Sequence, residues 1–412
     1  MVKDGYKKTE AGVIPEEWQT DTFQCCFDTL PNNTLSRAEL NYNGGTVKNI
    51  HYGDVLIKFP AVTDCQKEEI PYVNRDCVSK LGTVVLHDKD VIIADTAEDE
   101  TVGKATELIN VGEQRIVSGL HTIPCRPKQP EQFAPKWLGY FINHRSYHNQ
   151  LLPLITGTKV SSVSKSAIAD TVIVIPERNE QERIVDALSD IDELILSVEK
   201  LIAKKKDIRN GAMQELLSGK KRLQGFGDEW QEYMLGDECK FYGGGTPSTV
   251  NEDFWNGDIP WISSSDITAD NIFSINITRH ITTEAVSSSA TQLCPANCIL
   301  VITRVGVGKL AVCNHPICTS QDFLNLQLKR HNATFVAYKL LPVMKELAIA
   351  AQGTSIKGVS SDDVKAIRLI LPPKEEQDAI VELLHDMDLE IANLQMKLEK
   401  YKKFKIGMMD EL

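Results

Sequence analysis

Residues 176–200 read PERNEQERIVDALSDIDELILSVEK, and residues 372–396 read PPKEEQDAIVELLHDMDLEIANLQM. The two stretches share a proline, a Glu-Gln pair, an Ile-Val pair, a leucine, two aspartates and an isoleucine at a constant separation of 196 positions. The match continues over 157–216 and 353–412 without a gap. A chance match of that length is not credible, so the chain contains two copies of one unit.

Each copy is predicted to contain one long helix that begins just after Pro176 or Pro372, because proline suits the first turn of a helix. Apolar residues then recur at alternating steps of four and three, which is the spacing of a coiled-coil seam rather than of a helix lying on a broad core. The predicted helix–helix seam consists of Ile184, Leu188, Ile191, Ile195, Val198 and Ile202 in the first copy and of Ile380, Leu384, Met387, Ile391, Leu394 and Leu398 in the second. Each helix therefore needs a partner helix, and we expect the other copy to supply it.

The charge along each helix predicts the direction of pairing. The first half of each helix is acidic and the second half is basic, as with Asp190 and Lys204 in the first copy and Asp386 and Lys400 in the second. This polarity suits the helix macrodipole. Antiparallel pairing sets acidic ends against basic ends, whereas parallel pairing sets like charges together. A single charge of this kind is often only solvated, but a gradient present in both copies favours an antiparallel pair.

Length and composition bound the class of protein. With 412 residues the chain should hold more than one domain, and its 42% hydrophobic and 25% charged content is typical of a soluble protein. No apolar run approaches the roughly 20 residues needed to span a bilayer, and MVKDGYKKTEAG at the N-terminus lacks the apolar core of a signal peptide. We therefore expect a cytoplasmic protein with no membrane partner.

Cysteine content and net charge narrow the choice of ligands. Ten cysteines without a secretion signal suggest reduced thiols rather than a disulfide framework. Cys294, Cys298, Cys313 and Cys318 loosely imitate the spacing of zinc ligands, but the pattern matches no common zinc module, so we expect no metal. The net charge of −12 argues weakly against nucleic acid as a partner, since a local basic patch or a basic companion subunit can still supply phosphate contacts.

The body that precedes the first helix is predicted to be mixed α/β. Short β-branched runs at 54–57, 82–86 and 90–94 are typical of strands. Residues 135–143 form the one convincing internal helix. Many short strands with few helices indicate a curled, partly antiparallel sheet.

The second body repeats this plan with different residues. IPYVNR at 70–75 is matched to IPWISS at 259–264, and VGK at 102–104 is matched to VGK at 307–309. Two similar folds with different loop chemistry suit two readers of different targets. We therefore expect an α+β chain in which antiparallel helices relate the halves by a pseudo-twofold axis. Its four segments are a globular domain at 1–175, a long helix at 176–219, a second globular domain at 220–371 and a second long helix at 372–412.

No catalytic motif is recognisable. There is no Walker A sequence, because GVGK at 306–309 lacks the earlier glycine, and the glycines at 243–245 do not lead from a strand into a helix. His121, His280 and His315 have no paired nucleophile and base at a recognisable spacing. We therefore expect a protein that is not an enzyme.

Several segments, in this order along the chain, resemble one known family. They are GYKK at 5–8, IPEEW at 14–18, PERNEQ at 176–181, QELLSGKKRL at 214–223, GGTPS at 244–248 and RVGVGK at 304–309. Together with the duplication, they make the chain similar, over essentially its whole length, to the specificity subunit of type I restriction-modification systems. The first body departs from the pattern, since it has no counterpart of the GGTPS loop.

The resemblance implies two target-recognition domains, each reading one half of a bipartite target in double-stranded DNA, with the paired helices as the spacer. It also implies that the helices hold two methyltransferase subunits and that restriction subunits join through these. S-adenosylmethionine would then belong to the methyltransferase subunit and ATP with Mg²⁺ to the restriction subunit, so that this chain itself binds no cofactor. About forty helical residues would span roughly 60 Å, which is more than one turn of DNA.

Base edges and phosphates would be contacted by polar and basic side chains on loops. The candidate DNA-binding residues are Lys58, Asn74, Arg75, Lys104, His121, Lys159 and Ser161 in the first domain and Thr246, Ser248, Ser263, Ser264, Arg304, Lys309, Gln321 and Lys357 in the second. Any one of them could be only an exposed loop residue or a turn former, so the hypothesis concerns the set.

Two other functions are open at this point. The acidic charge favours a protein that bridges two protein partners, and co-purification with a methyltransferase would argue against it. The other alternative is an autonomous nuclease with an unrecognised centre, which cleavage by the purified chain with Mg²⁺ alone would favour. The bases of a DNA target cannot be predicted, because loop conformation decides which atoms face a groove.

Overall fold

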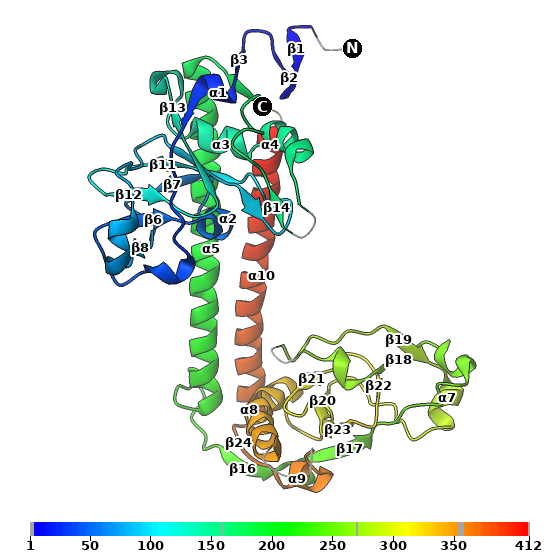
Figure 1. Ribbon diagram of the computed structural model, residues 1–412. Coiled ribbons are helices and arrows are strands. Elements are labelled where there is room, and N and C mark those ends of the chain that lie inside the picture. Colours follow the sequence, from blue (N-terminus) through cyan, green and yellow to red (C-terminus); the bar gives the residue numbers. More distant parts are fainter. Residues whose placement is uncertain (1–3, 158–159, 269–270, 353–357, 411–412) are drawn as a thin grey trace. The chain divides into compact units, whose positions relative to one another are not determined.

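The computed structural model describes residues 4–157, 160–268, 271–352 and 358–410. The chain forms two compact units: unit 1 contains Met1–Val198 with Leu398–Leu412, and unit 2 contains Glu199–Lys397. Each unit therefore holds one globular body together with a segment of each long helix (Figure 1).

Unit 1 is built on a five-stranded and a four-stranded sheet. The larger sheet has the order β4 (Phe27–Thr29), β13 (Thr122–Pro127), β9 (Val91–Ala94), β11 (Ala105–Ile109), β7 (Val62–Asp64). The smaller sheet has the order β12 (Ile116–Ser118), β6 (Lys48–Ile50), β8 (Tyr72–Val73), β5 (Leu40–Asn41). Three further pairs are β1 (Tyr6–Thr9) with β2 (Gly12–Pro15), β10 (Thr96–Ala97) with β14 (Ser161–Ser162), and β3 (Gln19–Thr22) with β15 (Val172–Ile175). The helices of the body are α1 (Phe23–Cys26), α2 (Tyr52–Ile57), α3 (Trp137–Asn143) and α4 (Arg145–Leu151).

Unit 2 is built on a four-stranded and a three-stranded sheet. Their orders are β17 (Cys239–Gly243), β23 (Phe323–Leu328), β20 (Cys298–Ile302), β21 (Leu310–Val312) and β19 (Arg279–Ile281), β18 (Ile259–Ile262), β22 (Cys318–Thr319). A further pair joins β16 (Gln231–Met234) to β24 (Arg368–Leu371). The helices of the body are α6 (Leu235–Glu238), α7 (Thr283–Ser287), α8 (Ala333–Gln352) and α9 (Ser361–Ala366).

The two units share one strand plan. β9 lies between antiparallel β13 and β11, as β20 lies between antiparallel β23 and β21. β6 lies between parallel β12 and antiparallel β8, as β18 lies between parallel β22 and antiparallel β19. All residues of β9 and β20 are buried, as expected for central strands with both faces covered. The prediction of two similar mixed bodies in an α+β chain is confirmed.

The two long helices are α5 (Arg178–Ser218) and α10 (Lys374–Asp410). In unit 1, Lys405 Nζ of α10 lies 2.6 Å from Asp192 Oδ1 of α5. In unit 2, Arg209 Nε of α5 lies 3.0 Å from Asp388 Oδ1 of α10. These pairs are reciprocal, because both the two aspartates and the two cations are separated by 196 positions. Within each unit the acidic start of one helix meets the basic end of the other, so the prediction of antiparallel pairing is confirmed.

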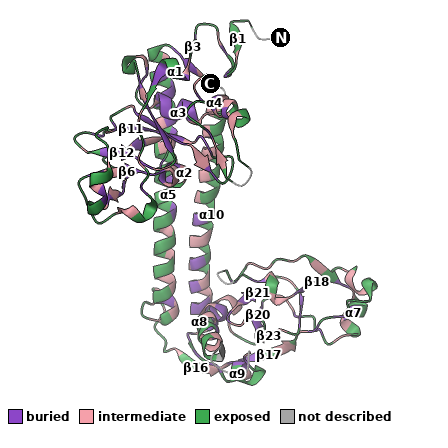
Figure 2. Cartoon of the chain, in the orientation of Figure 1, coloured by how far each residue is buried: buried purple, intermediate pink, exposed green. Residues whose placement is uncertain are grey.

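The twelve predicted seam residues are all buried or partly buried. Figure 2 shows that buried and intermediate residues are interspersed with exposed ones along α5 and α10. Leu188, Ile380 and Leu384 are at most 1% exposed, whereas Leu196 and Phe404, which lie off the seam, are at least half exposed. Leu188 packs in the core of unit 1, and Ile380 and Leu384 pack in the core of unit 2. Burial of one such side chain contributes about 2 kcal/mol, whereas a surface ion pair contributes about 0.5 kcal/mol. Burial along the seam therefore outweighs the ion pairs in energy, and the ion pairs agree with the antiparallel direction.

Two of the predicted strands are wrong. Residues 54–57 belong to α2, in which Gly53 N donates to His51 Nδ1 at 3.2 Å and so starts a helical turn. A run of four apolar residues does not separate a helix from a strand. Residues 82–86 form no strand; Leu86 N donates to Ile116 O at 2.8 Å, but no ladder continues from this bond. The predicted helix at 135–143 is confirmed as α3, which begins at Trp137.

The predicted match of 70–75 to 259–264 is also wrong. Residues 259–262 form β18, which lies between a parallel and an antiparallel neighbour. The strand of unit 1 in that position is β6, whereas residues 72–73 form β8, the counterpart of β19. The shared Ile-Pro-aromatic letters are a coincidence, because strand pairing and not local sequence decides the equivalence.

Candidate functional site

Three loops of unit 2 meet at one end of its strands. Ser320 N donates to Ile262 O and Thr303 N donates to Asp322 O, both at 2.8 Å, and Val359 N donates to Thr303 O at 2.8 Å. These bonds tie together the segments that follow β18, β20 and β22. We call residues 263–264, 303–304 and 321–322 loop cluster 2.

Unit 1 contains the same arrangement. Gly119 N donates to Ile50 O at 2.8 Å, Asp95 N donates to His121 O at 3.1 Å, and Val163 N donates to Asp95 O at 2.9 Å. The segments that follow β6, β9 and β12 are therefore joined as in unit 2. We call residues 51–52, 95–96 and 120–121 loop cluster 1.

A fourth matching bond fixes the equivalence of the hairpins. Ala94 N donates to Lys104 O at 2.8 Å in unit 1, and Ile302 N donates to Lys309 O at 3.2 Å in unit 2. The two lysines are the last residues of the VGK triplets at 102–104 and 307–309, which are matched to each other in the sequence. Counted from these bonds, the corresponding pairs are Tyr52 and Ser264, Thr96 and Arg304, and His121 and Asp322.

The glycine-rich loop of unit 2 reaches loop cluster 2. Thr246 Oγ1 donates to Gln321 Oε1 at 2.6 Å. Gly244 has to be glycine, because a Cβ there would lie 1.8 Å from Ser320 O. Ser248 lies farther along the same loop, where its carbonyl accepts a bond from Trp255 Nε1 at 3.1 Å. Of these candidates, the fold brings Thr246 and Gln321 directly together.

Ser263 is held by an ion pair that sequence reasoning missed. Its Oγ accepts a bond from Arg279 Nη2 at 2.8 Å, and Arg279 is also paired with Asp266. Burial disfavours the ionised form of Asp266, but hydrogen bonds from Ser263 and the charge of Arg279 lower its pKa overall. The side chain of Ser264 is half-buried and makes no bond to another described residue.

Arg304 is the exposed cation of loop cluster 2. It is followed by Gly306 and Gly308, whose φ angles of 92° and 97° require glycine. Lys309 is turned inward, since its Nζ donates to Ile267 O at 3.4 Å. Lys357 lies outside the described residues.

In unit 1, His121 belongs to loop cluster 1 and Ser161 lies beside it, because β14 pairs with β10 at Thr96 and Ala97. Lys104 is not available to a ligand. Its Nζ donates to Leu56 O at 2.7 Å, and burial lowers the pKa of its ammonium group. Lys159 lies outside the described residues.

Three other candidate DNA-binding residues of unit 1 do not lie at loop cluster 1. Asn74 Nδ2 donates to Ala38 O at 3.1 Å, which holds Asn74 against the segment that precedes β5. Arg75 follows it and is exposed. Both lie past the end of β8 that pairs near Lys48, at the other end of β6 from loop cluster 1. Lys58 Nζ donates to Glu69 O at 2.5 Å.

The hairpin loops of the two clusters differ in charge. The loop between β9 and β11 carries exposed Glu98, Asp99 and Glu100, whereas the loop between β20 and β21 carries exposed Arg304. The carboxylate of Asp99 accepts bonds from the hydroxyl and the backbone N–H of Thr101, and these lower its pKa. A phosphate is therefore favoured at the hairpin of unit 2 and repelled at that of unit 1.

A metal site and a membrane-spanning helix each place requirements on the described part of the chain. Within residues 4–157, 160–268, 271–352 and 358–410, no group of three His, Cys, Asp or Glu side chains is placed to hold a metal ion. Cys298 and Cys313 are fully buried, and Cys313 Sγ donates to Cys298 O at 3.5 Å. None of the described helices is both long enough and apolar enough for a membrane span.

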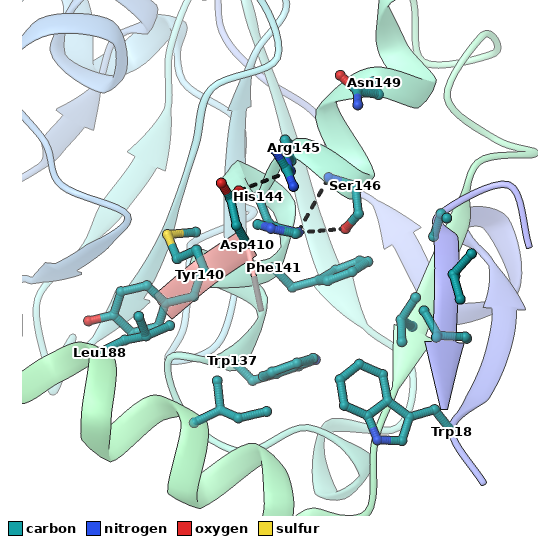
Figure 3. A pocket seen from close by; sticks show the side chains of 17 residues that line it. Trp18, Trp137, Tyr140, Phe141, His144, Arg145, Ser146, Asn149, Leu188 and Asp410 are labelled. Carbon is teal, nitrogen blue, oxygen red and sulfur yellow. Dashed lines mark hydrogen bonds and ion pairs between the residues drawn. The ribbon is translucent and has the colours of Figure 1, made fainter. Parts of the chain in front are cut away.

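Unit 1 also contains a cavity of about 240 Å³ that shares no lining residue with loop cluster 1. Trp18, Trp137 and Phe141 form aromatic walls, and Arg145 Nε lies 2.9 Å from Asp410 Oδ1 at its polar side (Figure 3). His144 starts α4 by accepting a bond from Ser146 N, and burial lowers the pKa of its imidazole. The cavity lies where the N-terminal hairpin, α3, α4 and the long helices meet.

Two bodies of one fold, each with an equivalent loop cluster but different side chains, define a protein with two recognition domains on paired helices. A family model described as the type I restriction modification DNA specificity domain matches residues 45–206 and again residues 227–401. The two matches cover most of the chain, one for each copy. The chain belongs to this family and is a specificity subunit rather than an enzyme.

Relatives agree with this assignment, and solved structures share the fold. The chain is 21% identical over its whole length to a chain assigned as the type I restriction enzyme MjaX specificity subunit of Methanocaldococcus jannaschii, of which it covers 96%. The fold is similar to that of a type I restriction-modification S subunit from M. genitalium, with a TM-score of 0.54, 14% identity and 95% of each chain covered. It is also similar to a chain from a structure of type I R-M complex assembly, with a TM-score of 0.59, 18% identity and 96% and 97% of the two chains covered.

Sequence reasoning missed Tyr52 and Thr96 of loop cluster 1 and Arg279 beside loop cluster 2. Counting back from the VGK triplets would not reach Thr96, because Thr96 lies eight residues before Lys104 whereas Arg304 lies five residues before Lys309. No local signal marks Tyr52, which is found only by pairing β6 with β12. Arg279 is likewise visible only through the pairing of β19 with β18.

Proposed function

We propose that each unit reads one half of a bipartite target in double-stranded DNA, through loop cluster 1 in unit 1 and loop cluster 2 in unit 2. The main support is that equivalent backbone hydrogen bonds hold different side chains in the two clusters. A shared frame with unlike polar groups suits two unlike half-sites, since hydrogen bonds to base edges carry sequence information.

Partner subunits would supply what this chain lacks. With 57 acidic and 45 basic residues the chain has a net charge of −12, so a basic companion would raise DNA affinity. We propose that two methyltransferase subunits dock on the paired helices and that restriction subunits join through them in the cytoplasm. S-adenosylmethionine would then belong to the methyltransferase and ATP with Mg²⁺ to the restriction subunit.

Domain exchange tests whether each unit recognises its half-site independently of the other unit. Residues 20–175 would be replaced by the equivalent segment of another family member, and the complex with its methyltransferase would be expressed in cells. Sequencing that detects methylated adenine should show one half-site changed and the other retained. A change in both halves, or the absence of any sequence-specific methylation, would contradict the proposal.

The spacer role of the helices has its own test. Helix α5 contains 41 residues, and insertion of seven residues at matched points of α5 and α10 keeps the seam in register. Each helix would lengthen by about 10 Å, which equals about three base pairs. Methylated sites with the original separation of the half-sites would refute the role.

A further inference from the structure

Loop cluster 1 contains an ordered group of rings. The ring centroids of His51 and Tyr52 lie 4.6 Å apart, and those of Tyr52 and His121 lie 5.3 Å apart in an edge-to-face arrangement. The side chain of His121 is 47% exposed. Ring contacts of this kind hold side chains in place before any ligand arrives, so the polar atoms of Tyr52 and His121 are already positioned.

The backbone also fixes His121. Its φ angle of 55° lies in the left-handed region, which is uncommon for a residue with a side chain. The bond from Asp95 N to His121 O holds this conformation at 3.1 Å. Strained residues of this kind are concentrated at functional sites, and His121 stands where unit 2 has Asp322.

The hydrogen bonds assign the tautomer of His121. Thr96 Oγ1 donates its proton to Asp95 Oδ1 at 2.7 Å, so that the threonine oxygen is left as an acceptor. His121 Nδ1 lies 3.3 Å from Thr96 Oγ1 and 3.4 Å from Asp95 Oδ1. Two acceptors facing Nδ1 keep the proton of the neutral ring on that atom, and Nε2 is left as an acceptor.

Two complementary polar atoms are therefore left free at the surface of loop cluster 1. Neither the Tyr52 hydroxyl nor His121 Nε2 makes a hydrogen bond to another residue that the structure describes. The hydroxyl can donate a bond, and Nε2 can accept one. In the major groove only adenine offers both an acceptor, N7, and a donor, the N6 amino group; guanine offers two acceptors, and the other two bases offer one polar group each.

We propose that Tyr52 and His121 form an adenine-reading pair in unit 1, with the Tyr52 hydroxyl donating to N7 and His121 Nε2 accepting from the N6 amino group. The inference rests on the proposed function and adds to it a specificity-determining residue, Tyr52, and the base that it reads. Unit 2 has Ser264 and Asp322 at these positions, so its cluster reads a different pattern.

The test uses the full chain purified with its methyltransferase subunit and competition binding to the mapped bipartite duplex. Each adenine of the half-site read by unit 1 is replaced in turn by 7-deazaadenine, which lacks the N7 acceptor. The complex should lose about tenfold in affinity at one position, the size of one good base contact. Tyr52→Phe should show the same loss on the unmodified duplex and no further loss with 7-deazaadenine at that position. His121→Gly, which the left-handed backbone tolerates, should become insensitive to removal of the N6 amino group there.

Tyr72→Phe is the matched control, because Tyr72 lies on β8 beside Lys48, at the end of β6 away from loop cluster 1. It should leave the sensitivity to 7-deazaadenine unchanged. Additive losses for Tyr52→Phe and 7-deazaadenine, or a unit 1 half-site in which no adenine is sensitive, would overturn the adenine-reading pair while bipartite recognition stood. A complex that selects no bipartite duplex would overturn the proposed function itself.

Discussion

The two units start the same helix in different ways. In unit 1, Glu107 reaches from β11 to accept bonds from Lys136 N at 2.6 Å and Gly139 N at 2.9 Å at the start of α3. In unit 2, Asn332 caps α8 locally by accepting a bond from Phe335 N at 3.0 Å. The strand position of Glu107 is occupied in unit 2 by Val312, which is buried. The same fold is therefore compatible with two kinds of helix cap. Unit 1 uses a carboxyl group from a distant strand, and unit 2 uses an amide next to the helix.

The junction with the long helices is conserved where the caps are not. Gln181 Oε1 accepts a bond from Ala134 N at 2.8 Å, and its repeat partner Gln377 accepts one from Asn332 N at 2.9 Å. Both side chains are fully buried, and their amides donate to Pro176 O and Pro372 O. The shared glutamine therefore ties the start of each long helix to its globular body. The units differ in one further partner of its amide, which is Gln132 O for Gln181 and His331 Nδ1 for Gln377.

Removing the shared glutamine should have the largest effect and should be equal in both units. Gln181→Ala and Gln377→Ala each leave buried backbone groups without a partner and open a cavity, so each should lower the free energy of unfolding by about 3 kcal/mol. Urea denaturation of the full chain, followed by hydrogen exchange in each unit, measures the loss. Gln214→Ala on the exposed face of α5 is the control and should cost less than about 0.5 kcal/mol. Unequal losses of unfolding free energy in the two variants would show that the two junctions are not equivalent.

The caps predict a pH response in unit 1 alone. Burial raises the pKa of the Glu107 carboxyl from 4.5 to about 7, although backbone hydrogen bonds from Gly139 and Lys136 oppose the shift. Because the pKa of Glu107 is higher in the folded state than in the unfolded state, its contribution to the free energy of unfolding is fully present below pH 4.5. This contribution is lost as the pH rises to about 7. The loss should reach about 3 kcal/mol. Urea denaturation from pH 4.5 to 8, read by hydrogen exchange in unit 1, measures it.

Two variants sharpen this contrast. Glu107→Gln should remove the pH dependence of unit 1 in that window. Asn332→Ala should cost unit 2 about 1 kcal/mol throughout the range from pH 4.5 to 8, as loss of a neutral cap does. A pH response of the same size in Glu107→Gln would show that other groups cause it.

The long helices and their antiparallel pairing could be predicted from the sequence, because they depend on a local periodic pattern. The seam and the charge gradient predict the antiparallel helices because both depend on residues a turn or two apart. The strand pairing could not be predicted, because the contact of β6 with β12 joins residues that are far apart in the chain. For the same reason the sequence finds His121 and Arg304 but not Tyr52, whose relation to His121 exists only after folding. The repeated Gln181 is visible in the sequence, but its partner Ala134 is not.

Trp18 and Trp230, each of which follows a glutamate, provide a finer comparison. Trp18 Nε1 donates to Glu180 Oε2 at 2.8 Å, whereas Trp230 Nε1 is buried without a partner in the described residues. Glu376, the repeat partner of Glu180, is instead paired with Arg222, whose guanidinium lies 5.7 Å from the centre of the Trp230 ring. Trp18→Phe should therefore cost about 1.5 kcal/mol more than Trp230→Phe, which is the value of a hydrogen bond to a charged group.

The comparison of the two phenylalanine variants cancels most of the packing loss, because both remove the same part of the indole. Urea denaturation at pH 7 measures the difference. Equal losses would mean that the hydrogen bond to Glu180 contributes nothing, and a larger loss for Trp230→Phe would reverse the contrast between the junctions.

The smallest expected difference lies in the reciprocal ion pairs. Arg209 donates to both carboxylate oxygens of Asp388 at 3.0 Å and to the Tyr338 hydroxyl at 3.2 Å, whereas Asp192 accepts bonds from Lys405 and from the Tyr140 hydroxyl. Arg209→Gln should therefore cost about 1 kcal/mol and Lys405→Gln about 0.5 kcal/mol at low salt. Both losses should shrink in 0.5 M NaCl, where charges on partly exposed side chains are screened. Losses that do not change with salt would show that these residues act through packing on the tyrosine rings, and the charges would then not set the direction of the helices.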